Sequence, residues 1–282
     1  MSVDLHLHTH HSDGTWSPAE LVTHAISIQL KHIAITDHDS ILGIEEAQDA
    51  ASGQLEIIPG IEINTIFTHA SGRREDIHVL GYFIDPTDTT LQKVLARQQQ
   101  ARKEHVYDSI KAIAALGIDI TPDSVQKHAG IGSIGRAHIT MAIVEAGGAA
   151  DVNEAWEKFM TRKSPHYVPR NSVSPADAVR AINAAGGIAS IAHPGGAKHI
   201  DALILQLREE AGLAAIEAYH RVHSNDLTNH FIELAQKNNM LVTGGSDCHG
   251  PFEDYAPTVG SVPLPLENLR RLRECHANQA LR

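Results

Sequence analysis

Histidines and carboxylates recur in short stretches of this chain at spacings typical of metal ligands. The first stretch, HLHTHHSDG, begins at His6, continues with His8 two residues later, and ends after Asp13. Residues two apart on a strand point to the same face, so His6 and His8 present two imidazoles side by side. These two imidazoles can form half of a metal site. The alternative interpretation is a histidine-rich N-terminus without function.

Five further stretches, TDHD, GIEI, IHVLG, AHP and SDCH, supply more residues of the same kinds. The candidates are His38, Glu62, His78, His193, Asp247 and His249. Imidazole and carboxylate ligands without thiolate suit Mn²⁺, Fe²⁺ or Zn²⁺ better than Ca²⁺ or Mg²⁺. Such ions lower the pKa of bound water from about 15.7 to about 7 and polarise a phosphate. These residues therefore suit phosphate-ester hydrolysis by a metal-held hydroxide, with no protein nucleophile.

These residues need a scaffold that brings distant parts of the chain together. Seven apolar runs are interpreted as strands: 3–8, 32–39, 55–64, 77–83, 188–194, 213–220 and 241–250. Most candidates stand near the C-terminal ends of these runs, with His78 at the start of the fourth. Alternating strands and helices indicate βα units around a parallel sheet or barrel, which builds its site at the C-terminal strand ends. We expect an α/β fold, a distorted seven-stranded (β/α) barrel.

The pattern changes between the fourth and fifth strands. Residues 88–175 read as helix throughout, so we expect an inserted helical cap on a barrel formed by 1–87 and 176–282. The insertion is richer in basic than in acidic residues, while the whole chain has a formal net charge of −11. Most of these charges belong on solvated helix faces. Arg136 and Lys163 stand in Gly- or Pro-punctuated stretches, where a loop can present them to an anionic substrate.

The glycine-rich stretch GIGSIG at 130–135 lacks the GK[ST] ending of a phosphate-binding P-loop. We interpret it as the lead into a helix that places Arg136 near a positive helix N-terminus. His138, in the following turn, is a candidate substrate contact. Glu217 and His220 lie at a strand end, where they can orient metal ligands. Nine other histidines are interpreted as surface or hydrogen-bonded residues: His10, His11, His69, His105, His128, His199, His223, His230 and His276.

Composition narrows the class of protein further. The 282 residues are 42% hydrophobic, which allows a large core, and they contain no bilayer-spanning run and no signal-peptide pattern. Cys248 and Cys275 form neither a disulfide framework nor a CxxC-type zinc motif. The acidic net charge argues against a broad DNA-binding surface. We therefore expect a cytoplasmic protein with no membrane association and no stable DNA partner.

Taken together, the motifs resemble those of the polymerase and histidinol phosphatase (PHP) family of metal-dependent phosphoesterases. HLHTHHSDG, AITDHD, PGIEI, IHVLGY, AHPGG and GSDCHG follow in this order across nearly the whole chain. The resemblance implies a PHP-type barrel and three divalent ions, with manganese favoured by the habit of the family. It implies one ion held by His6, His8, Glu62 and Asp247, a second by Glu62, His78 and His193, and a third by Asp13, His38 and His249.

The insertion, with its GRAH and KSPHYVP segments, resembles that of stand-alone members acting on 3′,5′-nucleotide bisphosphates and of relatives that trim RNA from its 5′ end. We expect hydrolysis of the 3′-phosphate of nucleoside 3′,5′-bisphosphates, with Arg136 and Lys163 binding the second phosphate or the sugar. The alternatives are a 5′→3′ exoribonuclease on short 5′-phosphorylated RNA, a histidinol phosphate phosphatase, and a metal-binding module without turnover. The complete ligand set argues against the last.

Overall fold

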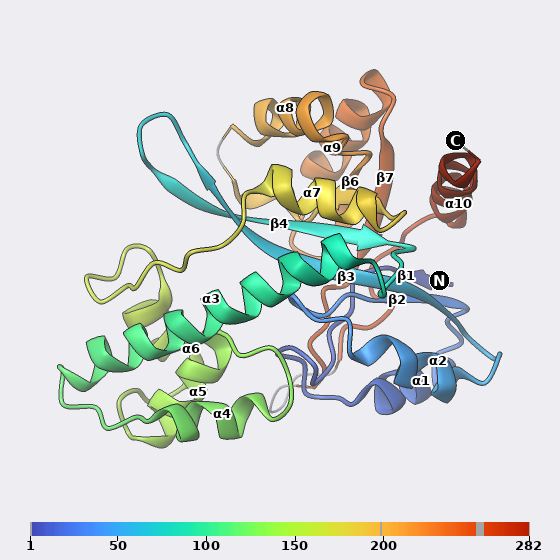
Figure 1. Cartoon of the computed structure of the whole chain (residues 1–282). Coiled ribbons are helices and arrows are strands. Elements are labelled where there is room, and N and C mark those ends of the chain that lie inside the picture. Colours follow the sequence, from blue (N-terminus) through green and yellow to red (C-terminus); the bar gives the residue numbers. More distant parts are fainter. Residues whose placement is uncertain (1, 198, 252–256, 282) are drawn as a thin grey trace.

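The computed structural model describes residues 2–197, 199–251 and 257–281. Within them, seven strands form one sheet in sequence order: β1 (Val3–Asp4), β2 (His32–Ile35), β3 (Glu56–Thr68), β4 (Arg74–Tyr82), β5 (Ile188–Ile191), β6 (Ala215–His220) and β7 (Leu241–Gly245). Beyond β1 and β7 the chain pairs again, because Leu7 bridges Cys248 and the His8 amide donates to the Cys248 carbonyl at 3.0 Å. The sheet thus curls into the predicted distorted seven-stranded barrel, which is nearly closed (Figure 1).

Several strands end earlier than the sequence predicts. β1 ends at Asp4, β2 at Ile35, β5 at Ile191 and β7 at Gly245. The ligand motifs at the ends of the apolar runs therefore lie mostly in loops. A loop can direct its side chains toward the axis of the barrel. If the strand continued instead, these side chains would lie beyond the rim of the barrel.

β4 is an exception to the parallel arrangement. It runs antiparallel to both β3 and β5, while the other neighbouring pairs are parallel. Only residues 69–73 separate β3 from β4, and this is too short for a helical crossover, so the two strands form a hairpin. The prediction of βα units throughout is wrong here. His78 lies in the middle of β4, opposite Asn64, and not at a strand start.

Helices surround the barrel: α1 (Pro18–Ser27), α2 (Gly43–Ala51), α7 (Pro175–Ala184), α8 (Ile200–Ala211), α9 (Asn225–Lys237) and α10 (Leu266–Ala280), with the short 3₁₀-helix η2 (Pro194–Gly196). As the sequence predicts, Ser17 caps α1 and Pro18 occupies its first turn. Among the described residues, no helix is both long and apolar enough to cross a bilayer.

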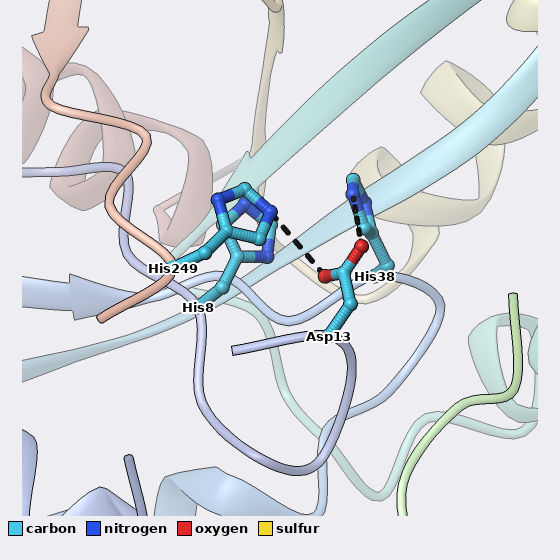
Figure 2. A group of neighbouring side chains, drawn as sticks. All are labelled: His8, Asp13, His38 and His249. Carbon is cyan, nitrogen blue, oxygen red and sulfur yellow. Dashed lines mark ion pairs between the residues drawn. The ribbon is translucent and has the colours of Figure 1, made fainter. Parts of the chain in front are cut away.

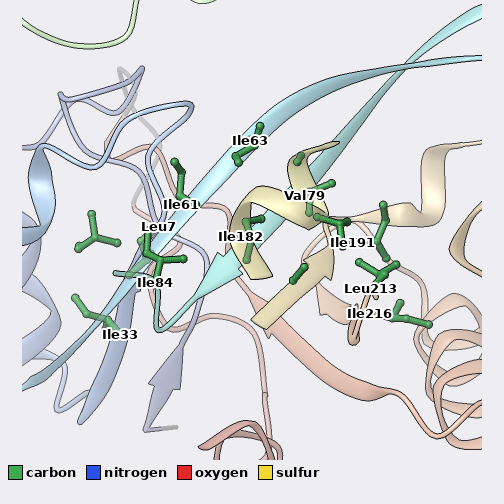
Figure 3. Close-up of a cluster of buried hydrophobic side chains, with 14 of the residues drawn as sticks. Leu7, Ile33, Ile61, Ile63, Val79, Ile84, Ile182, Ile191, Leu213 and Ile216 are labelled. Carbon is green, nitrogen blue, oxygen red and sulfur yellow. The ribbon is translucent and has the colours of Figure 1, made fainter. Parts of the chain in front are cut away.

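The faces of the strands divide the core of the barrel into two clusters. On β4, Val79 packs against the surrounding helices (Figure 3), whereas Leu80 and Tyr82 point to the interior of the barrel. Leu269 and Leu272 of α10 join this inner cluster. Since side chains alternate along a strand, His78 faces the same side as Leu80 and Tyr82. The alternation therefore directs His78 toward the barrel interior.

The segment between β4 and β5 has an apolar core of its own. It contains α3 (Thr89–Ala114), α4 (Pro122–Ala129), α5 (Arg136–Glu145), α6 (Val152–Ala155) and the π-helix η1 (Trp156–Met160). In Figure 1, α3 runs from the barrel to the group formed by α4, α5 and α6. The prediction of helix throughout is wrong for 161–174, which forms turns and loop, because Pro165 and Pro169 lack the amide that a helix needs.

Candidate metal centre

Four side chains meet at the mouth of the barrel, namely His6, His8, Glu62 and Asp247. His6 Nε2 lies 3.3 Å from Glu62 Oε2 and 3.4 Å from Asp247 Oδ1, and His8 Nε2 lies 3.3 Å and 3.1 Å from the same two oxygens. Four tetrahedral ligands at about 2.0–2.2 Å from one ion lie roughly 3.3–3.6 Å apart. Both imidazole nitrogens and Glu62 Oε2 are buried without a hydrogen-bond partner in the described part of the chain. The donor set fits a divalent ion.

The backbone bends sharply where two of the predicted ligands leave their strands. His193 has a φ of 28° and Asp247 a φ of 52°. Few residues other than glycine adopt positive φ, and such positions cluster at functional sites. The Asp247 amide donates to the His6 carbonyl at 2.9 Å. This contact joins the loops after β1 and β7 and brings both side chains to the same place.

Glu62 of β3 faces imidazoles with both of its oxygens. Oε1 lies 2.9 Å from His78 Nδ1 and 3.1 Å from His193 Nε2, while Oε2 lies 2.8 Å from His38 Nδ1 in addition to His6 and His8. A carboxylate that bridges two ions needs such an arrangement. Glu62 is completely buried, so no solvent competes for its oxygens.

A further group consists of His8, Asp13, His38 and His249, whose ligand atoms lie within 4.8 Å of one another (Figure 2). His249 Nε2 is 3.3 Å from Asp13 Oδ1, and His38 Nε2 is 3.8 Å from Asp13 Oδ2. All the predicted ligands therefore lie around one continuous cluster. Their grouping differs from the one that the resemblance implies, because His8 joins this set and His38 also faces Glu62.

Two residues lie behind the cluster, and one of them, Glu217, holds predicted ligands in place. Glu217 Oε1 lies 2.9 Å from His6 Nδ1, and its Oε2 accepts the His193 amide at 2.7 Å. His220 Nε2 lies 3.5 Å from Asp247 Oδ2. Because Glu217 holds Nδ1 of His6, the Nε2 of that ring is turned toward the other ligands.

The electrostatics of the cluster favour a cation. Burial would raise the carboxyl pKa values of Asp13, Glu62 and Asp247, but the surrounding imidazoles outweigh burial and hold these pKa values well below the usual range. Burial lowers the pKa of His38 to about 4, so its ring is neutral. Burial also opposes the charge of His249, but Asp13 and Asp247 outweigh it and raise the pKa of His249 to about 10. A bound cation would take the place of that proton.

A cavity of about 430 Å³ opens in front of the cluster. Its size falls within the range of small-molecule sites. One wall carries predicted metal ligands: Asp13, His38, His78, His193, Asp247 and His249. The other lining residues include four arginines and an aromatic side chain: Arg102, Arg136, Arg170, Arg221 and Trp156. The cavity therefore lies where the barrel meets the helical insertion.

The structure brings one of the three predicted substrate-binding residues into this cavity. Arg136 opens α5, with its guanidinium 5.0 Å from the Trp156 ring centre and one nitrogen 3.3 Å from Asp76 Oδ2. Lys163 is exposed in the turn after η1, outside the lining of the cavity. His138 is buried, and its Nδ1 accepts the Gly135 amide at the start of α5.

The other arginines of the cavity were not predicted from the sequence. Arg102 lies in the middle of α3, where a helical pattern suggests a solvated face, yet it is buried and its Nε donates to Asp39 Oδ2 at 2.7 Å. Arg170 follows Pro169 in the same proline-containing stretch as Lys163. The expectation that a loop presents Lys163 to the substrate therefore applied to Arg170 as well. Burial and the neighbouring guanidinium groups lower the pKa of Arg170 to about 9, so it stays charged at neutral pH.

Clustered cations act on a phosphoryl group and arginines bind its oxygens, so this site is suited to hydrolysis of a phosphate ester. The protein is accordingly of the class of metal-dependent phosphoesterases. The family model of the PHP domain matches residues 4–237. The chain belongs to this family, and the family membership predicted from its motifs is confirmed.

Similar proteins of known name or structure support the same class. The chain is 32% identical to the 3′,5′-nucleoside bisphosphate phosphatase of Chromobacterium violaceum, over 94% of this chain and 93% of the relative. It is 31% identical to the 5′-3′ exoribonuclease Rnm of Escherichia coli, over 88% of this chain and 85% of the relative. A solved amidohydrolase of Chromobacterium violaceum, with bound sulfate and no metal, superimposes with a TM-score of 0.86 at 31% identity, covering 97% of this chain and 96% of that one.

Proposed function

We propose that this phosphoesterase hydrolyses the 3′-phosphate of nucleoside 3′,5′-bisphosphates to give the 5′-monophosphate and phosphate. The observation that carries the proposal is the composition of the cavity. Predicted metal ligands form one wall, and another contains Arg136 and Arg170, which the metal-assisted hydrolysis itself does not require. A substrate with two anionic groups satisfies both walls at once.

We infer three divalent ions at the cluster, with Mn²⁺ favoured. Ions bound there would polarise the phosphoryl oxygens and lower the pKa of the attacking water. The chain itself holds the ligand rings in place. Asn64 Nδ2 lies 2.8 Å from His78 Nε2, and Arg102 donates to Asn64 Oδ1 at 2.6 Å, so the orientation of the amide is fixed by a buried cation.

The second phosphate would bind between Arg136 and Arg170. Arg136 stands at the N-terminus of α5, where the unpaired backbone amides of the first turn also favour an anion. Burial and nearby positive charge disfavour the charged form of Arg170, as its lowered pKa shows. A phosphate between the two guanidinium groups relieves that repulsion and accepts bidentate hydrogen bonds.

Two features support a nucleotide as the rest of the substrate. Trp156 lines the same cavity, and an aromatic ring offers a stacking surface to any nucleobase. The Chromobacterium violaceum relative is named for nucleoside bisphosphates, and the solved structure from that organism holds a sulfate. The cavity thus offers guanidinium groups to a dianion and an aromatic ring to a base, which supports a nucleotide substrate.

A 5′→3′ exoribonuclease is the second candidate. The relative from Escherichia coli carries that name, and Arg221 lines the cavity while being exposed, where a longer RNA could leave it. Histidinol phosphate fits less well, because its amine would meet a wall of guanidinium groups. The two nucleotide activities need the same cluster and differ in what lies beyond the first nucleotide.

A substrate panel tests the proposal. With added Mn²⁺, we expect kcat/KM to be highest for adenosine 3′,5′-bisphosphate, lower for adenosine 3′-monophosphate, and lowest for histidinol phosphate. The product of the first should be adenosine 5′-monophosphate, and a chelator should abolish turnover. A higher kcat/KM for a 5′-phosphorylated trinucleotide would favour the exoribonuclease instead.

A further inference from the structure

A second group of potential metal ligands lies beside the loop that carries Asp13. It consists of His10 and His11 in that loop and Glu46 on α2, each with one ligand atom within 4.8 Å of the others. Within the described residues none of the three lines the cavity in front of the main cluster. These residues are therefore not explained by the phosphoesterase reaction.

His11 is the most unusual member of this group. It is only 5% exposed, and neither of its ring nitrogens has a hydrogen-bond partner in the described chain. The expectation that it is a surface or hydrogen-bonded residue is thus wrong. His10 Nε2 is likewise buried and unpartnered. Buried polar atoms are almost always hydrogen-bonded, so two such rings side by side need an explanation.

The main cluster provides that explanation by analogy. The other described histidines with a buried, unpartnered ring nitrogen all lie in or next to the predicted metal centre: His6, His8, His38 and His220. In this chain, an imidazole nitrogen that is buried without a partner is therefore typical of a position where several ligand atoms converge. His10 and His11 show the same property at a separate place.

The separation of the ligand atoms also fits an ion. His11 Nε2 and Glu46 Oε2 lie 3.7 Å apart, too far for a hydrogen bond. Tetrahedral ligands at about 2.0–2.2 Å from a common ion lie roughly 3.3–3.6 Å apart, close to the observed separation. The Glu46 side chain is 44% exposed, so water can complete the coordination.

We propose that His10, His11 and Glu46 bind a divalent cation with a preference for imidazole, such as Zn²⁺. Two imidazoles and one carboxylate are a known zinc-ligand set, and nitrogen donors favour zinc over magnesium or calcium. The proposal does not depend on which phosphate ester the main site hydrolyses.

The position of this site indicates a structural role. The ion would tie the loop between His8 and Asp13 to α2. On the other side of the same loop, the Ser133 amide donates a hydrogen bond to the His11 carbonyl oxygen at 2.8 Å. A Cβ added to Gly132 would lie 2.3 Å from the His10 carbonyl oxygen, so the segment leading to α5 packs directly on this loop. Fixing the loop would therefore stabilise both the Asp13 turn and its contact with the insertion.

Zinc binding to matched variants tests the proposal. Glu46→Gln removes one ligand, and Glu45→Gln makes the same change at the neighbouring exposed position outside the group. Metal-free protein is dialysed against a Zn²⁺ buffer, and bound zinc per chain is measured by elemental analysis. We expect Glu46→Gln to bind one Zn²⁺ fewer than both the wild type and Glu45→Gln, and to show a smaller rise in Tm on zinc addition.

His10→Gln provides a second variant at a half-buried position, and it should also lose one Zn²⁺. Equal zinc content in Glu46→Gln and Glu45→Gln would overturn the proposal, as would an equal zinc-induced rise in Tm in these two variants. Because Glu46 is exposed, this pair decides the question even if His10→Gln fails to fold. Activity is not needed for either readout.

Discussion

Glu62 is the residue on which most of the cluster depends. Its two oxygens face the imidazoles of His6, His8, His38, His78 and His193, all within 3.3 Å. These rings come from parts of the chain that are far apart in sequence. Without the carboxylate, several ligand nitrogens would be left buried around an uncharged gap, so metal affinity should fall at more than one position.

Metal content tests the bridging role of Glu62. Glu62→Gln keeps the size of the side chain and removes its charge, and Asp13→Asn makes the same change at a ligand of one group only. We expect Glu62→Gln to lose two Mn²⁺ ions per chain and Asp13→Asn to lose one, measured by elemental analysis after equilibration with Mn²⁺. Equal losses from two folded variants would count against a bridge at Glu62.

The elements that carry the site differ in how readily the sequence reveals them. The clustering of these histidines and carboxylates was predictable because each stands in or within a few residues of an apolar run, and a strand of a barrel ends at its mouth. The reversed direction of β4 was not predictable from the alternation of its side chains. This alternation places His78 inward whether the strand is parallel or antiparallel to its neighbours. Arg102 was missed for a similar reason. A mid-helix arginine becomes a pocket residue only through the packing of α3 on Asp39.

The stability of the insertion should depend on pH through His105 of α3. This ring is buried, with Nε2 2.9 Å from the Val168 carbonyl oxygen, and burial lowers its pKa to about 4. The unfolded chain has the ordinary pKa of about 6.5 and takes up the proton more readily. The contribution of His105 to the free energy of unfolding is therefore fully present above pH 6.5. It decreases by ~3 kcal/mol as the pH falls to 4.

His105→Gln removes this titration while keeping an N–H donor for Val168. Urea unfolding without added metal, at pH values from 7 to 4, gives the free energy of unfolding of both proteins. We expect the wild type to be the more stable at pH 7, with a difference that narrows as the pH falls. A difference that stays constant over this range would show that His105 does not titrate on unfolding.

At the scale of the whole molecule, the proposed substrate site belongs to neither apolar core alone. The barrel supplies the predicted metal ligands, and the insertion supplies Arg102, Arg136 and Arg170. Buried polar contacts join the two parts, since Gln98 donates to both Asp39 Oδ1 and the Asn64 carbonyl. The positions of the guanidinium groups relative to the cluster are therefore set by packing, and the proposed selectivity for substrates with two phosphates rests on that arrangement.

The proposed recognition of a second phosphate by Arg136 is tested by the ratio of kcat/KM for adenosine 3′,5′-bisphosphate to that for adenosine 3′-monophosphate, in the wild type and in Arg136→Ala. Loss of a hydrogen bond to a charged group costs roughly 1.5–3 kcal/mol, so the variant should lose about ten- to a hundred-fold or more on the bisphosphate. It should lose far less on the monophosphate, and Lys111→Ala, which removes an exposed cation of α3, should change neither value. We expect the ratio to collapse toward one in Arg136→Ala. An unchanged ratio, with both substrates losing equally, would contradict it.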